Sequence, residues 1–139
     1  MGLIKKKVKI SNMEDLFKEK SGLISHDKVR SVEVEAIIDS GVRMLCLPED
    51  LVEKLGLETV DKKTVVYANG QKEIKKIGSA VRIEIMERKT ACQVLIERPG
   101  APVLLGHIPL EDLDFVIDMS REDLVVNPES PYLPLAYMY

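Results

Sequence analysis

The sequence predicts one all-β domain, built as a small closed β-barrel or folded sheet with one or two short helices. Three observations lead to this fold class. Apolar and polar residues alternate in several segments, turn-forming residues separate these segments, and helix signals are few. The 139 residues are 45% hydrophobic and 31% charged, which is the balance of one compact globular domain.

Alternation with a period of two identifies the strands. Their apolar positions are Val8 and Ile10, then Val32, Val34, Ala36 and Ile38, then Val81, Ile83 and Ile85, then Cys92, Val94 and Ile96. Charged or polar residues lie between them, so each strand is expected to bury one face. Turn signals predict that successive strands return antiparallel, and they lie at Asn69-Gly70, Glu87-Arg88-Lys89, Pro99-Gly100 and Asp118-Met119-Ser120-Arg121.

The clearest helix signal spans residues 48–55. Pro48 suits the first helical position, two acidic residues follow at the positive end of the helix dipole, and Gly56 can end the helix. A second short helix is expected over residues 109–113. Residues 13–20 are expected to add a further turn or two between the first two strands.

We interpret residues 1–139 as a single domain, in which residues 1–30 form an N-terminal strand and a connecting segment. From Asn127 onwards the chain holds three of its seven prolines and three of its four tyrosines. This composition predicts that residues 129–139 form an extended, non-helical tail, laid over apolar surface or over a partner.

Charge and composition argue against several functions. A net charge of -3 and an aromatic content of 4% give no basis for binding nucleic acid. The apolar stretches are much shorter than the roughly 20 residues of a membrane-spanning helix, so no membrane association and a cytoplasmic location are expected. Cys46 and Cys92 lie in apolar, strand-like segments and are expected to be buried free thiols.

A cysteine or metal site is a weaker alternative. It would use Cys46, Cys92, His26 and His107, but no two of these residues have the short spacing of a metal-ligand motif. We therefore expect no metal and no cofactor. His107 is interpreted as a polar residue at the start of the second short helix.

Asp39 differs from the other carboxylates, most of which lie beside lysines or on the charged face of a strand. It follows the apolar run Ala36-Ile37-Ile38 and precedes Ser40-Gly41, so a strand delivers a carboxylate into a tight turn. Ser40 offers a hydroxyl donor, and Gly41 lets the chain and a substrate approach closely. This pattern is typical of a buried, hydrogen-bonded carboxylate.

Four segments, in order, carry a family resemblance. Ile37-Ile38-Asp39-Ser40-Gly41, followed by Leu45-Cys46-Leu47-Pro48, resembles the active-site segment of retropepsin-like aspartic peptidases of the bacterial and archaeal branch. Tyr67-Ala68-Asn69-Gly70-Gln71 resembles their flap, the hairpin that closes over the substrate. Val103-Leu104-Leu105-Gly106 resembles the strand that supports the active-site loop, and residues 108–128 resemble the closing helix and strands.

The resemblance implies a closed retropepsin-like barrel and a peptidase that uses two carboxylates sharing one proton. Because the chain has a single Asp-Ser-Gly triplet, at Asp39-Ser40-Gly41, the second aspartate would come from another copy of the chain. The resemblance thus implies a homodimer that cleaves a peptide or protein substrate. The implied site comprises the catalytic residues Asp39, Ser40 and Gly41, the substrate-binding flap Tyr67, Ala68, Asn69 and Gly70, and the support residues Leu104, Leu105 and Gly106.

Two residues depart from the family pattern. Family members usually carry a small residue after the glycine and then Ser or Thr, whereas this chain has Val42 and Arg43. These side chains would narrow the site or alter the hydrogen bonding of the loop. Two functions therefore stay open: an active aspartic peptidase, or a non-catalytic module of the same fold that binds a peptide or dimerises. Residues 124–128 and the tail are the candidate dimer interface.

Overall fold

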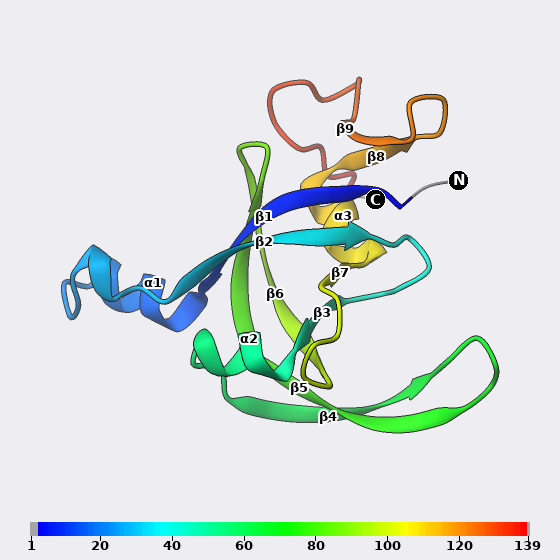
Figure 1. Ribbon diagram of the computed structural model, residues 1–139. Helices are drawn as coiled ribbons and strands as arrows, with labels where there is room; N and C mark the ends of the chain where they lie inside the picture. Colours follow the sequence, from blue (N-terminus) through cyan, green and yellow to red (C-terminus); the bar gives the residue numbers. More distant parts are fainter. Residues whose placement is uncertain (1–2, 139) are drawn as a thin grey trace.

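The computed structural model describes residues 3–138, which form a mainly β fold (Figure 1). The strands are β1 (Lys5–Asn12), β2 (Ser31–Ile38), β3 (Leu45–Pro48), β4 (Thr59–Val66), β5 (Lys72–Ile85), β6 (Arg88–Glu97), β7 (Leu104–Leu105), β8 (Phe115–Asp118) and β9 (Asp123–Val126). The helices are α1 (Met13–Lys20), α2 (Glu49–Lys54), α3 (His107–Leu113) and the 3-10 turn η1 (His26–Lys28). The predicted β class is confirmed. The expectation of one or two helices is wrong, because the described residues contain three α-helices.

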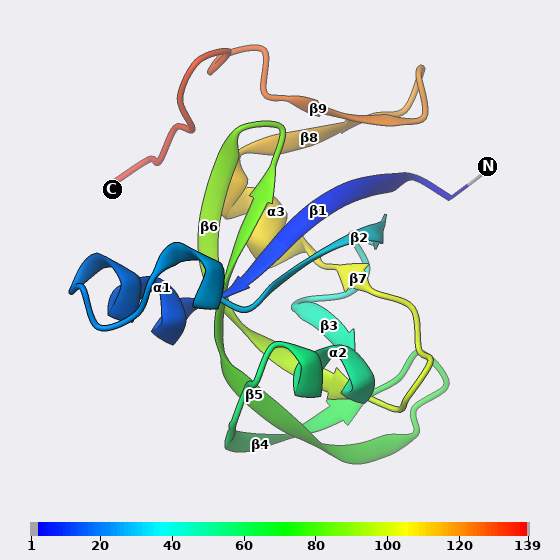
Figure 2. The same ribbon diagram turned by 60° about the vertical axis from the view of Figure 1, so that its left-hand side comes forward.

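Seven strands form one sheet in the order β1-β2-β7-β3-β6-β5-β4. Because β1 also pairs with β5, six of them close into a ring, and β4 extends from β5 outside it. The remaining strands, β8 and β9, form a separate ribbon at the opposite end of the molecule from β4 (Figure 2).

The consecutive strand pairs β1–β2, β4–β5, β5–β6 and β8–β9 are antiparallel, as predicted. The antiparallel return predicted at Pro99-Gly100 is wrong, because β7 pairs with β2 and β3 and not with β6. Two pairings between strands distant in sequence are parallel, namely β2 with β7 and β3 with β6. The first of these places Ile38 opposite Leu105, so the residue that follows β2 lies beside β7.

The core combines alternating residues that identified the strands with buried residues from other segments, among them Leu45, Leu47, Leu55 and Leu105. Fully or almost fully buried are Val8, Ile10, Ala36, Ile38, Val81, Ile83, Ile85 and Val94, joined by Val52 from α2 and Leu110 and Leu113 from α3. Each such Val, Leu or Ile stabilises the fold by about 1.5–3 kcal/mol relative to an exposed position. The alternation missed β4, because nearly all its residues are exposed.

The helices begin close to their predicted positions. Pro48 is the N-cap residue of α2 and does not take the first helical position. Gly56 follows the C-cap residue Leu55 and has a positive φ of 66°. His107 opens α3, as interpreted from the sequence, two residues before Pro109. Within residues 3–138, no helix combines the length and apolarity needed to cross a membrane.

Asp15 and Arg30 connect α1 to the start of β2. The Arg30 Nε and Nη2 atoms donate to the two Asp15 oxygens at 2.8 and 3.0 Å, and the Arg30 backbone N–H adds a third bond at 3.0 Å. The Asp15 side chain is buried, whereas Arg30 is half-exposed. These hydrogen bonds hold the pKa of Asp15 below its usual range, although burial opposes the shift.

We predict that the stabilisation from Asp15 depends on pH. Because its folded pKa is lowered, the contribution is present above the unfolded pKa of about 4 and is lost as the pH falls through the folded value. Asp15→Asn should therefore lower the Tm most at neutral pH, and the difference from the parent should shrink on acidification. Thermal unfolding followed by circular dichroism measures this. A difference that stays constant from neutral to strongly acidic pH would contradict the assignment.

Arg88 and Asp114 anchor the C-terminal segment. The buried Arg88 donates through Nη1 to the carbonyls of Leu113 and Asp114, at 2.9 Å each, and through Nη2 to the carbonyl of Ser130. Asp114 accepts from the Leu135 N–H at 2.8 Å.

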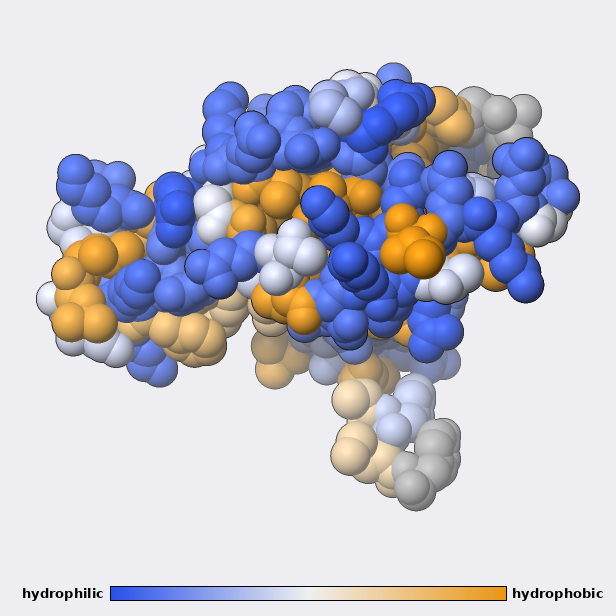
Figure 3. Space-filling model, turned by 90° about the horizontal axis from the view of Figure 1, so that it is seen from below, coloured by the Kyte–Doolittle hydropathy of each residue, from blue (hydrophilic) through white to orange (hydrophobic). Residues whose placement is uncertain are grey.

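The tail is non-helical through residue 138 and extends away from the body of the molecule (Figures 2 and 3). Tyr132 is 91% exposed, Leu133 76% and Met138 92%. The expectation that the tail lies over apolar surface of its own chain is therefore wrong. The alternative, that a partner covers it, stays a prediction.

Candidate functional site

Asp39 directly follows β2 and is half-buried. Its N–H donates to the carbonyl of Leu105 at 3.0 Å, so β7 fixes the point at which the chain leaves the sheet. Its Oδ1 accepts from the N–H of Gly41 at 3.0 Å, and its carbonyl accepts from Val42 at 3.1 Å. The predicted tight turn is present, and a backbone amide orients the carboxylate.

Ser40 and Gly41 both lie on the surface of the single chain. Among residues 3–138, no hydrogen bond involves the Ser40 hydroxyl, so this donor is not used within the single chain. A Cβ added at Gly41 would meet only the Asp39 Oδ1, at 3.3 Å. The side of the loop that carries these two residues is therefore open.

Leu104, Leu105 and Gly106 support this loop. Leu105 pairs with Ile38 of β2 on one side and with Leu45 of β3 on the other. Three successive amides after it hold the loop: Gly106 donates to Met44 at 3.1 Å, His107 to Val42 at 2.7 Å, and Ile108 to Arg43 at 3.1 Å.

Gly106 is required by this close approach rather than by its backbone angles. Its φ of -85° and ψ of 179° suit any residue. However, an added Cβ would lie 2.4 Å from the Val42 carbonyl oxygen and 2.5 Å from that of Met44. The structure thus brings Asp39 and the predicted support residues together through the backbone.

The predicted flap is the β4–β5 hairpin. Its turn is closed by the Tyr67 N–H donating to Gln71 and the Gly70 N–H donating to Tyr67, at 2.9 Å each. Gly70 has a positive φ of 84°, but Asn69 does not, and its side chain instead accepts from the Gln71 N–H at 2.9 Å. The tip of this hairpin and the loop after β2 project to the same side of the molecule (Figures 1 and 2).

A small apolar cluster, separate from the main core, joins the three groups of predicted site residues. Its buried members are Cys46 of β3, Ile77 of β5 and Leu95 of β6, and the partly buried Val42, Met44, Val65 and Leu104 pack against them. They come from the Asp39 loop, the hairpin and the support strand. Sequence reasoning singled out Leu104 as support, but not this cluster, because its members are far apart in the chain.

Neither cysteine is arranged as a nucleophile. Both are free thiols, but only Cys46 is buried as expected, whereas Cys92 is half-buried. Burial, with the negative charges of Glu97 and Asp39, raises the pKa of Cys46 to about 11, and burial raises that of Cys92 to about 12. Both thiols are protonated at neutral pH and react slowly. Residues 3–138 contain no group of three or more His, Cys, Asp or Glu side chains that could hold a metal ion.

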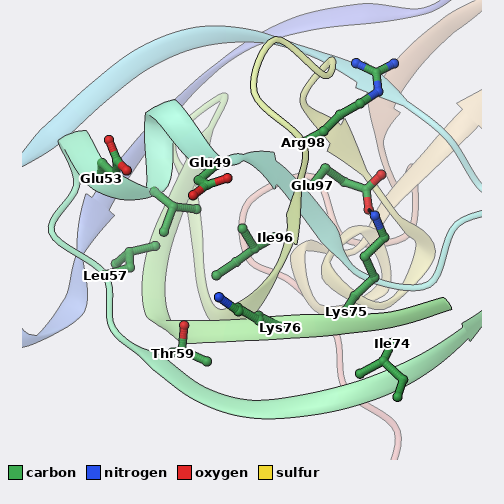
Figure 4. A pocket seen from close by; sticks show the side chains of 11 residues that line it. Glu49, Glu53, Leu57, Thr59, Ile74, Lys75, Lys76, Ile96, Glu97 and Arg98 are labelled. Atoms are coloured by element: carbon green, nitrogen blue, oxygen red, sulfur yellow. Dashed lines mark ion pairs between the residues drawn. The ribbon is translucent and has the colours of Figure 1, made fainter.

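Two hollows lie beside the hairpin. The one under its tip has a volume of about 410 Å³ and is lined by Tyr67, Asn69, Gln71, Glu73, Lys75, Glu97 and Arg98. The other, of about 350 Å³, lies between α2, β5 and the end of β6, and includes Glu49, Leu57, Lys75, Ile96 and Glu97 (Figure 4). Asp39 lines neither hollow.

Comparison with known proteins gives one family. The family model described as gag-polyprotein putative aspartyl protease matches residues 27–112, more than half of the chain. The matched region runs from η1 to α3 and contains the Asp39 loop, the hairpin and β7. No curated protein matches the chain.

Proposed function

Because the chain belongs to the retropepsin-like aspartyl protease family, we propose that it is an aspartic endopeptidase that uses Asp39 from each of two subunits. The observation that carries this proposal is the Asp39 carboxylate itself. It follows the buried Ile38 at the end of β2, and its Oδ1 accepts from the Gly41 amide on the open side of the loop, while the Asp39 N–H donates to Leu105 of β7. Loss of cleavage in Asp39→Asn tests the proposal.

In the proposed mechanism, the two Asp39 carboxylates face each other and share one proton, since two like charges so close cannot both ionise. The ionised carboxylate accepts a proton from a water, whose oxygen attacks the carbonyl carbon of the peptide. The protonated carboxyl donates to the carbonyl oxygen. Collapse of the resulting diol breaks the C–N bond, and the leaving nitrogen takes up a proton.

The flap Tyr67, Ala68, Asn69 and Gly70 would close over the bound peptide and exclude water. The small apolar cluster supports this role, because it extends from Val42 and Met44, beside Asp39, to Val65 in the hairpin. A substrate lying along it would place apolar side chains near the scissile bond.

The proposed mechanism requires a homodimer, so we predict a dimer at tens of micromolar. The open side of the Asp39 loop and the exposed apolar tail support this assignment. Sedimentation velocity should show a species of twice the chain mass. Gly41→Val should shift it toward monomer, because the added side chain points to open surface in the single chain but would meet the partner. A parent that is monomeric over this range would contradict the proposed site.

The non-catalytic module remains the second candidate, because Val42 and Arg43 depart from the family pattern. Val42 packs against the small apolar cluster, and Arg43 is exposed without an ion pair among the described residues. The carbonyls of both residues still accept the hydrogen bonds from His107 and Ile108 that hold the Asp39 loop, which supports the peptidase. If the parent fails to cleave a broad panel of denatured proteins but the double variant Val42→Ala, Arg43→Thr succeeds, the non-catalytic function is favoured.

A further inference from the structure

A charged network lies under the flap, in the hollow beside the hairpin tip. The Lys75 ammonium is 3.1 Å from the Glu73 Oε2 and 3.3 Å from the Glu97 Oε1. The Tyr67 hydroxyl donates to the same Glu73 oxygen at 3.0 Å. All four residues line the hollow under the hairpin tip, and the Lys75–Glu97 ion pair is drawn in Figure 4.

The charges of this network do not balance. Two carboxylates share one ammonium, so Glu73, Glu97 and Lys75 together carry one excess negative charge. The Glu97 Oε1 is buried and makes no hydrogen bond of good geometry, so its one contact with a cation is the 3.3 Å ion pair to Lys75. Arg98 also lines the hollow, but it is exposed and its guanidinium points away from the Lys75–Glu97 pair (Figure 4).

The small apolar cluster connects the Asp39 loop to the strand that carries Glu97. Val42, whose N–H donates to the Asp39 carbonyl, packs against the cluster, and Cys46 of the cluster pairs with Leu95 of β6. Leu95, two residues before Glu97 on β6, packs in the same small apolar cluster. A peptide that crosses this cluster from Asp39 would therefore bring one of its outer side chains to the hollow.

We propose that this hollow is a specificity subsite that selects a basic substrate side chain, Lys or Arg, at a position removed from the scissile bond. The inference rests on the proposed peptidase function. A cationic side chain would offset the excess charge of Glu73 and Glu97, whereas a carboxylate would add a third negative charge beside one ammonium. In this proposal Glu97 is the main specificity-determining residue. Lys75 weakens the attraction for a cationic side chain, because its ammonium is already paired with Glu73 and Glu97.

Peptide binding to the Asp39→Asn protein tests the subsite without any turnover. Fluorescence anisotropy would compare peptides that differ only in carrying Lys, Leu or Glu at each outer position in turn. At one position we expect the Lys peptide to bind about 3- to 10-fold more tightly than the Leu peptide, and the Glu peptide to bind most weakly. The preference should fall as salt is raised.

Two substitutions of opposite sign sharpen the test. Glu97→Gln should reduce the preference for Lys to below about twofold, and Lys75→Gln should increase it. Lys76→Gln is the matched control, because Lys76 lines the other hollow but not the one under the hairpin tip, and it should leave the preference unchanged. Thermal unfolding would establish that each variant is folded. If Lys75→Gln does not fold, the result for Glu97→Gln decides the test.

Equal affinity for the three peptides at every position, or no binding of any of them, overturns the subsite. So does a preference for Glu, or a preference for Lys that survives Glu97→Gln. The proposed peptidase function fails separately, through absence of cleavage by the parent protein.

Discussion

Asp39→Asn is expected to lower the rate of cleavage of a denatured protein substrate about a thousandfold or more, while the protein stays folded and dimeric. The amide keeps the shape of the carboxylate and can still accept from the Gly41 N–H. It cannot take a proton from water, and it cannot hold the proton that the pair shares. Turnover should therefore disappear although peptide binding persists.

The parent enzyme should show a bell-shaped dependence of kcat/KM on pH, with its maximum on the acid side of neutrality. One limb reports loss of the shared proton and the other reports protonation of the carboxylate that acts as the base, so the profile belongs to the pair of carboxylates. Relief of repulsion between the two carboxylates should leave the Asn variant at least as stable as the parent near neutral pH.

Asp61→Asn provides the matched control. Asp61 is an exposed aspartate in β4 whose Oδ1 accepts only from the Lys62 N–H, so the same chemical change should leave cleavage within about twofold of the parent. If Asp39→Asn retains the activity of the parent, the cleavage comes from another site or from a contaminating peptidase, and Asp39 loses its role.

The sequence predicted the Asp39 loop because its determinants are local. An apolar strand end, a carboxylate and a glycine follow one another in the chain, and the hairpin turn at Asn69-Gly70 is equally local. The extent of that hairpin was not predictable in the same way, since β4 is almost entirely exposed and β5 begins nine residues before its first alternating position, Val81.

The parts of the site that depend on packing between distant strands were missed. Lys75 and Glu97 look like ordinary surface charges in sequence, and they meet because β5 and β6 pair with Ile77 opposite Leu95. The small apolar cluster has the same origin. The tail was misjudged for a different reason: its composition predicts extended structure but does not determine what covers it.

Gly106→Ala is expected to destabilise the protein by about 3 kcal/mol and to reduce activity about 100-fold. Without a clash, alanine would stabilise this position by about 0.4–1 kcal/mol, because the backbone angles are allowed and the unfolded chain would lose freedom. Because of the clash, the substitution instead lowers the free energy of unfolding. The added Cβ would lie 2.4–2.6 Å from backbone atoms of Val42, Met44 and Arg43, which cannot rotate away.

Relief of this clash must move the Asp39 loop away from β7. The three hydrogen bonds that the backbone amides of Gly106, His107 and Ile108 donate to the loop would then lengthen. The two Asp39 carboxylates of the proposed dimer would lose their alignment. Denaturant unfolding and cleavage rates measure the two effects on the same sample.

Gly78→Ala is the comparison that separates this effect from overpacking in general. Its added Cβ would meet a side-chain methyl of Val94 at 2.7 Å, in a neighbouring strand rather than in the loop. We expect a loss of about 1 kcal/mol with nearly normal cleavage by the folded fraction. If Gly106→Ala also leaves cleavage by the folded protein intact, the position of Asp39 does not depend on the contact between Gly106 and its loop.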